Sequence, residues 1–228
     1  EMTTQGAVAT KRDIWKSAYA AINHINNIVE HAEDDIDTYK HSGLYLGEAL
    51  ALRALTHFEL LKLFGPPYWA PDAMKKQVLP YVTKYSFDIK DFDSYDKVYD
   101  AILSDLGRAE KYLAEDETLV PAERNKTANS FTDARIAHMN LYAVQALTAK
   151  VYWSRNDLDN AEKYAEKVIS SGKFSFRPVS AFVQPDNGTL DLHETIFGLF
   201  VNDETTMMKK LSLAETVGSS AMKLASDY

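Results

Sequence analysis

Three long stretches of the sequence contain no proline, and this feature most limits how the chain can fold. The seven prolines stand at positions 66, 67, 71, 80, 121, 178 and 185, which leaves residues 1–65, 81–120 and 122–177 without any. Proline disrupts the interior of a helix, so stretches of this length are typical of helical segments. All three also repeat apolar residues every three or four positions, the period of a helix with one buried face.

The first two predicted helices have clear signals at their ends. We expect the first helix to begin near Asp13, whose carboxylate can cap it, and to bury a stripe of isoleucine, alanine and valine. The second, at residues 44–64, is apolar almost all the way round, which predicts a central, buried helix. The glycine and two prolines at positions 65–67 predict its end.

Three further helices are predicted, at residues 94–114, 133–154 and 157–170. We expect Asn156 to cap the last of these and Gly172 to terminate it. Beyond Gly172 the pattern changes to loop, with one short extended piece at most.

The fourth and fifth predicted helices carry a repeat signature. Ala149, Tyr152 and Ala161 combine two small residues and an aromatic at the spacing of a tetratricopeptide repeat. The small residues allow two antiparallel helices to approach, and the aromatic fills the space beside them. The closing proline of that repeat is missing, so an unrelated helical hairpin remains an alternative. We predict a mainly α fold, a tetratricopeptide-like α-α superhelix of antiparallel helical hairpins with long loops.

Composition excludes several classes of function. The 228 residues carry a net charge of −8, which argues against a nucleic-acid partner. The absence of cysteine excludes disulfides, thiolate zinc sites and cysteine nucleophiles. The longest stretch without a charged residue, 136–149, has 14 residues, whereas a membrane-spanning helix needs about 20. The first ten residues lack the pattern of a signal peptide, so we expect any export signal to have been removed.

The motifs of common enzymes fail at specific positions. His193 and Glu194 begin like a zinc-protease helix, but Phe197 stands where the second histidine is required. The sequence has no glycine-rich phosphate loop and no Gly-x-Ser-x-Gly elbow. We therefore predict no metal site, no cofactor and no catalytic residue. A glycosidase remains open, since two carboxyl groups about 5–9 Å apart can come from distant segments.

Several phrases of the sequence, in order, are similar to those of one family. Residues 48–54 read Glu-Ala-Leu-Ala-Leu-Arg-Ala, residues 64–68 read Phe-Gly-Pro-Pro-Tyr, and residues 79–83 read Leu-Pro-Tyr-Val-Thr. With their neighbours they resemble the SusD/RagB family of bacterial outer-membrane lipoproteins. The matching segments are residues 13–28, 48–68, 79–83, 99–113, 146–172 and 193–197.

This resemblance implies a cell-surface protein that binds an oligosaccharide or other nutrient and delivers it to a SusC-like TonB-dependent outer-membrane transporter, without catalysis. The lipid-bearing cysteine of the family is absent, as is its large C-terminal half. We therefore expect the N-terminal, repeat-bearing portion of such a protein, attached to the membrane only through a lipid anchor that this chain lacks. Residues 1–200 are expected to form the helical repeat region. Residues 201–228 are expected to form an unassigned tail, with the start of a truncated C-terminal subdomain as an alternative.

Aromatic residues concentrate in the connection between the second and third predicted helices. Six of the 29 residues at 65–93 are aromatic, about 21% against 11% overall. Flat rings suit the polarised C–H groups of a pyranose face, and long loops are often functional. The candidate ligand-binding residues are Tyr68, Trp69, Tyr81 and Tyr85, with Trp69 the strongest. The alternative, that rings cover the helix ends, is preferred for Phe87 and Phe92 and also applies to Tyr81.

Three other residues are predicted to be structural. Trp15 and Trp153 lie at apolar positions of helices, so we expect both in inter-helix packing. Arg53 lies in the most apolar helix and must find a partner, because an unpaired buried charge is costly. A second hypothesis for function is a protein–protein scaffold, since tetratricopeptide arrays bind peptides along a concave face. Exposed aromatics on loop tips favour sugars, whereas aromatics along a helical groove favour a peptide.

Overall fold

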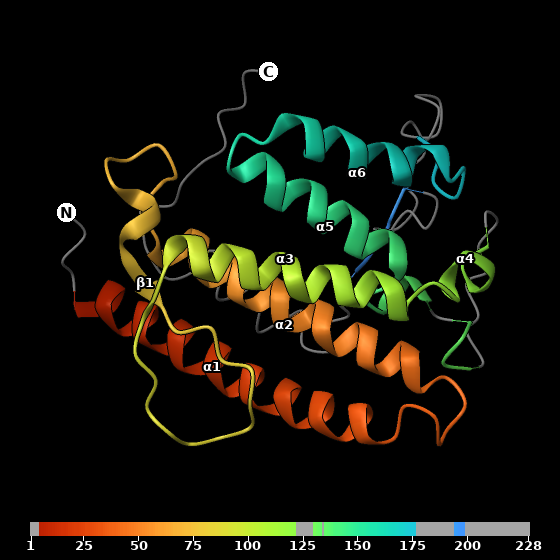
Figure 1. Cartoon of the computed structure of the whole chain (residues 1–228), viewed down its shortest axis with the longest axis horizontal. Helices are drawn as coiled ribbons and strands as arrows, with labels where there is room; N and C mark the ends of the chain where they lie inside the picture. Colours follow the sequence, from red (N-terminus) through yellow and green to blue (C-terminus); the bar gives the residue numbers. More distant parts are fainter. Residues whose placement is uncertain (1–4, 122–129, 134, 177–193, 199–228) are drawn as a thin grey trace, which may run out of the picture. The chain divides into compact units, whose positions relative to one another are not determined.

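The structure is a computed structural model that describes residues 5–121, 130–133, 135–176 and 194–198 (Figure 1). Six α-helices and a small two-stranded sheet are found in this part of the chain. The predicted tail at residues 201–228 lies outside the described residues. Among the helices that are described, none is long and apolar enough to cross a membrane.

The helices pack one against the next in chain order. The five longest of the described helices are α1 Gln5–Asp34, α2 Ser42–Phe64, α3 Tyr95–Tyr112, α5 Leu141–Ser154 and α6 Leu158–Ser170. Helix α2 lies between α1 and α3, α3 also contacts α5, and α5 pairs with α6 (Figure 1). This antiparallel arrangement confirms the predicted mainly α, tetratricopeptide-like fold.

Short elements fill the connections. The segment between α2 and α3 holds the 3-10 helix η1 (Ala73–Lys75) and the antiparallel strands β1 (Gln77–Leu79) and β2 (Asp93–Ser94). The segment before α5 holds α4 (Asp116–Leu119) and the 3-10 helix η2 (Arg135–Ala137). The pairing of β1 with β2 closes the second half of the aromatic connection, residues 80–92, into a loop.

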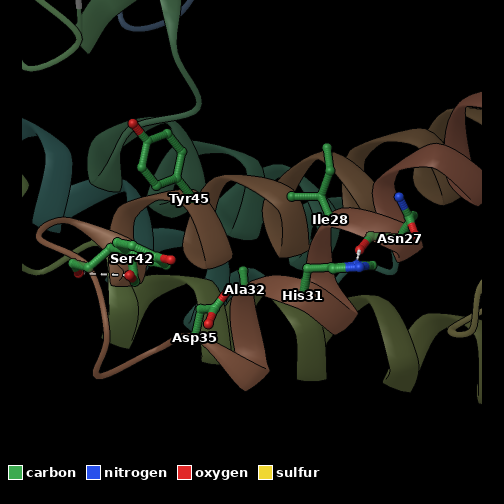
Figure 2. A pocket seen from close by; sticks show the side chains of 8 residues that line it. Asn27, Ile28, His31, Ala32, Asp35, Ser42 and Tyr45 are labelled. Atoms are coloured by element: carbon green, nitrogen blue, oxygen red, sulfur yellow. Dashed lines mark hydrogen bonds between the residues drawn. The ribbon is translucent and has the colours of Figure 1, made fainter.

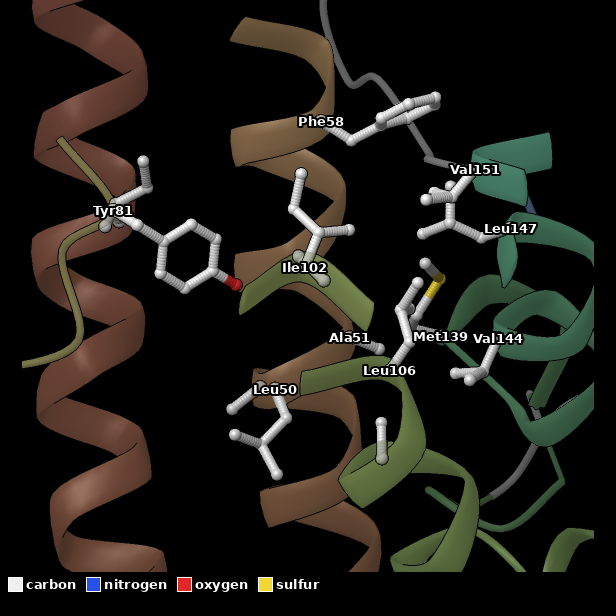
Figure 3. Close-up of a cluster of buried hydrophobic side chains, with 14 of the residues drawn as sticks. Leu50, Ala51, Phe58, Tyr81, Ile102, Leu106, Met139, Val144, Leu147 and Val151 are labelled. Carbon is white, nitrogen blue, oxygen red and sulfur yellow. The ribbon is translucent and has the colours of Figure 1, made fainter. Parts of the chain in front are cut away.

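The core lies where α2, α3 and α5 meet. Apolar side chains from all three helices converge there, as the prediction of a central second helix requires (Figure 3). They include Phe58, Ile102, Leu106, Val144 and Val151. Gly47 allows α2 to approach the end of α3, because a Cβ at this position would stand 2.6 Å from Leu113 Cγ.

Two predicted helix starts and one predicted cap are wrong, for local reasons. Helix α1 begins at Gln5 rather than near Asp13, and no proline interrupts the preceding residues. Helix α5 begins at Leu141 rather than at residue 133, because the Asn140 side chain accepts a hydrogen bond from Ala143 N and caps the helix there. At α6 the cap is Asp157, since Asn156 adopts a left-handed conformation with φ 62°. Gly172, with φ 65°, follows α6 as predicted.

Candidate functional site

The end of α2 presents two adjacent aromatic rings beside a pocket. Helix α2 ends at Phe64, as the glycine and prolines after it predict, and the chain turns outward. Trp69 is 74% exposed, and the half-buried ring of Tyr68 meets it edge-on with centroids 5.4 Å apart. Edge-to-face packing of this kind fixes the orientation of a ring that otherwise faces solvent.

The pocket beside these rings has a volume of about 290 Å³. It is bounded by the end of α2, by Tyr68 and Trp69, and by one residue each from α3 and α5, namely Tyr95 and Ser154. Its wall is mostly apolar, with Lys62 as its charged residue. Lys62 Nζ donates a hydrogen bond to Glu59 Oε1 at 2.6 Å. An apolar wall with few polar groups is the usual make-up of a small-molecule site.

Tyr85 lies further along the same connection, over α1. Its ring is 43% exposed and packs edge-on against Phe87, with centroids 5.8 Å apart. At this point the connection is held to α1 by backbone N–H groups: Tyr85 N donates to Glu30 Oε1 and Ser86 N to Asn23 Oδ1, both at 3.0 Å. Tyr85 does not line the pocket of Tyr68 and Trp69. It belongs to a separate aromatic surface.

The two phenylalanines of the connection behave differently. Phe92 stacks on Trp15 with centroids 5.8 Å apart, and Trp15 also packs edge-on against Phe64. This confirms the structural interpretation of Phe92 and of Trp15. Phe87 is 87% exposed, so the expectation that it covers a helix end is wrong. Residues 85 and 86 are bonded to α1, and Phe87, which follows them, is exposed to solvent.

Tyr81 is the most buried of the four candidate residues, with 8% of its surface exposed. Its ring stacks on His57 at 3.9 Å, and its hydroxyl donates a hydrogen bond to Asp105 Oδ2 at 2.6 Å. Burial first, and then the charge of Asp105, raise the pKa of Tyr81 well above its ordinary value. The structure therefore brings Tyr68 and Trp69 together and separates them from Tyr81 and Tyr85.

Arg53 pairs with a carboxylate that sequence spacing did not indicate. Its Nε and Nη2 donate to Asp105 of α3 at 2.6 and 2.8 Å, and its Nη1 donates to Asn26 Oδ1 at 2.9 Å. Nη1 also donates to the carbonyl oxygen of Thr83 at 3.2 Å. The prediction that Arg53 is structural is supported, and its role is to hold the aromatic connection against three helices.

His57 completes this network in its neutral form. Val82 N donates to His57 Nε2 at 3.1 Å, so Nε2 carries no proton, and Nδ1 donates to the carbonyl oxygen of Arg53 at 2.9 Å. Burial lowers the pKa of His57 from 6.5 to about 4. A second bond thereby joins the connection to α2.

A second buried arginine was missed by sequence reasoning. Arg135 Nε and Nη2 donate to Asp116 at 2.6 and 2.9 Å, and its Nη1 donates to Glu48. Glu48 Oε2 also bonds His138 Nδ1 at 3.0 Å, and Asp116 Oδ2 accepts a bond from Leu141 N. The members come from α2, α4, η2 and the start of α5, too far apart in sequence for any spacing rule to connect them.

Trp153 does not pack between helices as predicted. It is 67% exposed on the last turn of α5, although the neighbouring Val151 is fully buried. The stacked rings of Tyr152 and Tyr164, with centroids 5.7 Å apart, instead fill the space between α5 and α6. Tyr152 thus has the position that the repeat signature assigns to its aromatic.

Metal-binding side chains do not gather in the described part of the chain. In those residues, no three His, Asp or Glu side chains lie close enough together to hold a metal ion.

A further pocket, lined by charged residues, lies between α1 and α3, and its carboxylates are each bonded to a neighbouring residue. Glu33 pairs with Arg108, Glu30 accepts from Tyr85 N, and Asp105 binds Arg53.

The architecture of this chain matches that of known proteins. Two solved structures share the fold: a SusD superfamily protein from Bacteroides thetaiotaomicron, with a TM-score of 0.67 and 23% identity, and a SusD-like carbohydrate binding protein from Bacteroides vulgatus, with 0.58 and 18%. The alignments cover 83% and 74% of this chain, but 39% and 33% of those proteins.

Sequence comparison agrees with the fold. SusD-like protein P2 of Formosa agariphila is 24% identical over 196 residues, which are 80% of this chain and 32% of that protein. The chain therefore spans about a third of this curated relative. A SusD-like family model, described as starch-binding associating with outer membrane, matches residues 2–153. Because this match takes in 152 of the 228 residues, the chain belongs to the SusD-like family.

Proposed function

We propose that the chain is the helical portion of a non-catalytic cell-surface protein that binds a glycan nutrient. The observation that carries this proposal is Trp69, a large ring left 74% exposed at the mouth of a pocket. An exposed indole packed on Tyr68 at the wall of a mostly apolar pocket has the make-up of a small-molecule site. Family membership makes a saccharide the ligand of choice.

The pocket of Tyr68 and Trp69 has the chemistry that a sugar needs. The apolar C–H face of a pyranose packs on the Trp69 ring, and the pocket wall receives its edge. Lys62 and the Tyr68 hydroxyl are placed to bond hydroxyl groups of the sugar. Because Tyr68 and the prolines before it hold Trp69 in place, little side-chain freedom is lost on binding, which favours affinity.

Titration calorimetry with maltoheptaose tests this proposal. Trp69→Ala should weaken binding at least about tenfold, which corresponds to about 1.4 kcal/mol. Ile169→Ala is the matched control, since Ile169 is 76% exposed on α6 and does not line the pocket. Equal affinity of the Trp69→Ala variant and the control would reject this pocket as the site.

We further propose delivery of the glycan to a SusC-like TonB-dependent transporter, with the full-length protein lipid-anchored in the outer membrane. Supporting this, α5 and α6 carry three exposed apolar side chains: Trp153, Leu158 and Ile169, at 67%, 54% and 76%. Exposed apolar surface marks sites of protein contact. Co-purification of the transporter with the lipid-anchored protein tests the partnership, and its loss in Leu158→Ser would assign it to α5 and α6.

The protein–protein scaffold remains the second candidate, favoured by one observation. Trp153 lies on a helix rather than on a loop tip, as expected for a peptide-binding repeat surface. The two functions differ in what the wild-type protein binds. The scaffold is supported if wild type captures a peptide or protein partner, Trp153→Ala weakens that capture, and wild type binds no maltoheptaose; binding of maltoheptaose by wild type would favour the glycan function.

A further inference from the structure

A second pocket lies at the opposite end of the α1–α2 hairpin (Figure 2). Its volume of about 390 Å³ exceeds that of the pocket beside Trp69. The value lies within the range, about 300–1,000 Å³, of sites that hold small molecules. The residues that give the pocket its chemistry are Asn27, His31, Asp35, Tyr39, Ser42 and Tyr45. At 1.5 Å per residue of α2, about 30 Å separates Tyr45 from the Trp69 end.

Tyr45 is a half-exposed ring that the protein itself holds in place. It is 48% exposed and stacks on Phe131 with centroids 4.6 Å apart and planes 24° from parallel. Phe131 in turn packs against the Arg135 guanidinium, 5.1 Å from its ring centroid. Arg135 is buried and paired with Asp116, so the stack is anchored in the core. A ring fixed in this way forms a platform before any ligand arrives.

Tyr39 supplies a second ring from the turn between the helices. It is 67% exposed, yet its backbone is well held, because its carbonyl oxygen accepts bonds from Ser42 Oγ at 2.7 Å and Ser42 N at 3.2 Å. Two tyrosines on the wall of one pocket offer both an apolar face and a hydroxyl.

The pocket also holds polar groups. His31 Nδ1 donates to the carbonyl oxygen of Asn27 at 2.8 Å, which leaves Nε2 of the ring for a ligand (Figure 2). The Asp35 carboxylate adds acceptors. Acceptors beside tyrosine rings match the hydroxyl groups and C–H faces of a sugar.

The charge around the pocket restricts the ligand. Residues 33–37 contain four carboxylates, and of these Glu33 is paired with Arg108. Three carboxylates remain close in sequence to the pocket, against Lys40 on the same turn. This excess of negative charge disfavours uronic acids, sulfated sugars and phosphates.

We propose that the pocket of Tyr39 and Tyr45 is a second, independent saccharide site that takes a neutral hexose unit. The choice of a saccharide rests on the proposed function, whereas the platform, the volume and the charge are properties of this pocket alone. Two sites about 30 Å apart along α2 would engage separate stretches of one long glycan.

Amide chemical shifts of the labelled protein, titrated with maltoheptaose, test the proposal. Shifts should move at residues 31–45 and persist in Trp69→Ala. Tyr39→Ala should weaken this response at least about fivefold, while Tyr39→Phe, which keeps the ring, should stay within about twofold of wild type. An oligogalacturonate of equal length should bind at least about tenfold more weakly, because the pocket is acidic.

The other outcomes overturn the inference in distinguishable ways. Shifts at the Trp69 pocket alone would reject the second site and leave the proposed function standing. Shifts at neither pocket would reject both. Loss of the response at residues 31–45 in Trp69→Ala would show that the second site is not independent. Equal binding of oligogalacturonate would reject the neutral class of ligand.

Discussion

The two buried arginines, Arg53 and Arg135, solve the same problem in different ways. Arg53 has one carboxylate partner, Asp105, which also accepts the hydroxyl of Tyr81. Arg135 has two, Asp116 and Glu48. The Arg53 network therefore depends on a single carboxylate, whereas in the Arg135 network two carboxylates share the pairing with the guanidinium.

This difference bears on the binding surfaces. The Arg53 network bonds Tyr81, Val82 and Thr83 and so fixes the aromatic connection between α2 and α3. The Arg135 network supports Tyr45 through Phe131. We expect the connection to be sensitive to one substitution, whereas the Tyr45 platform should tolerate the loss of either partner better.

The largest effect is expected for Asp105→Asn. It leaves Arg53 charged and buried without Asp105, its one carboxylate partner among the described residues, which should lower the free energy of unfolding by about 3–5 kcal/mol. Urea unfolding followed by circular dichroism measures the change. Asp100→Asn is the control, because Asp100 lies exposed on the same helix. An effect as small as that of the control would show that the network does not depend on Asp105.

Mild acid should also act on the Arg53 network, through His57. Its pKa falls from 6.5 to about 4 on folding, so only the unfolded chain takes up a proton between these values. The folded state should then lose about 1.4 kcal/mol per pH unit as the pH falls through this window, about 3 kcal/mol in total. Above pH 6.5 this contribution to stability is fully present.

A variant isolates the histidine from other groups that titrate in acid. His57→Gln cannot take up the proton, so the stability gap between wild type and variant should narrow from pH 7 to pH 4. Urea unfolding across this range measures it, with His24→Gln as the exposed control on α1. A gap that stays constant would contradict the assignment to His57.

The Arg135 network should respond less to the loss of one charge. Glu48→Gln leaves the paired bonds from Arg135 to Asp116 intact, so we expect a cost of about 1–2 kcal/mol. The comparison with Asp105→Asn is matched, since both changes replace a buried carboxylate by its amide. Equal costs in urea unfolding would remove the distinction between the two networks.

The sequence predicts the local structure well and the partners poorly. Helical periodicity and the turn at residues 65–67 place α2, α3 and α6 to within a few residues, because these signals are local. The start of α5 was missed because Asn140 caps the helix at Leu141, whereas the residues before it form the 3-10 helix η2, whose Arg135 bonds Asp116 and Glu48. The need of Arg53 for a partner was predictable, but Asp105 lies 52 residues away.

For the candidate site, too, the location was predictable from the sequence, whereas the contacts of the individual residues were not. Aromatic enrichment located the connection, and Trp69 is exposed as a binding residue must be. The burial of Tyr81 agrees with the structural alternative given for it, but composition could not name His57 and Asp105 as the partners of its ring and hydroxyl, because these lie on two different helices. Tyr39 and Tyr45 were missed because they lie in a turn and a helix with no local enrichment.

The smallest effect is expected at the rim of the Arg135 network. His138 is half-buried, and within the described residues its side chain has one hydrogen bond, to the Glu48 oxygen that Arg135 does not use, so His138→Ala should cost less than about 1 kcal/mol. The change also removes the edge-on contact of His138 with Phe131, which leaves the ring held by Arg135. If the Tyr45 platform depends on Arg135, the response of residues 31–45 to maltoheptaose should survive this substitution. Its loss, with stability nearly unchanged, would assign the support of Phe131 to the histidine rather than to the arginine.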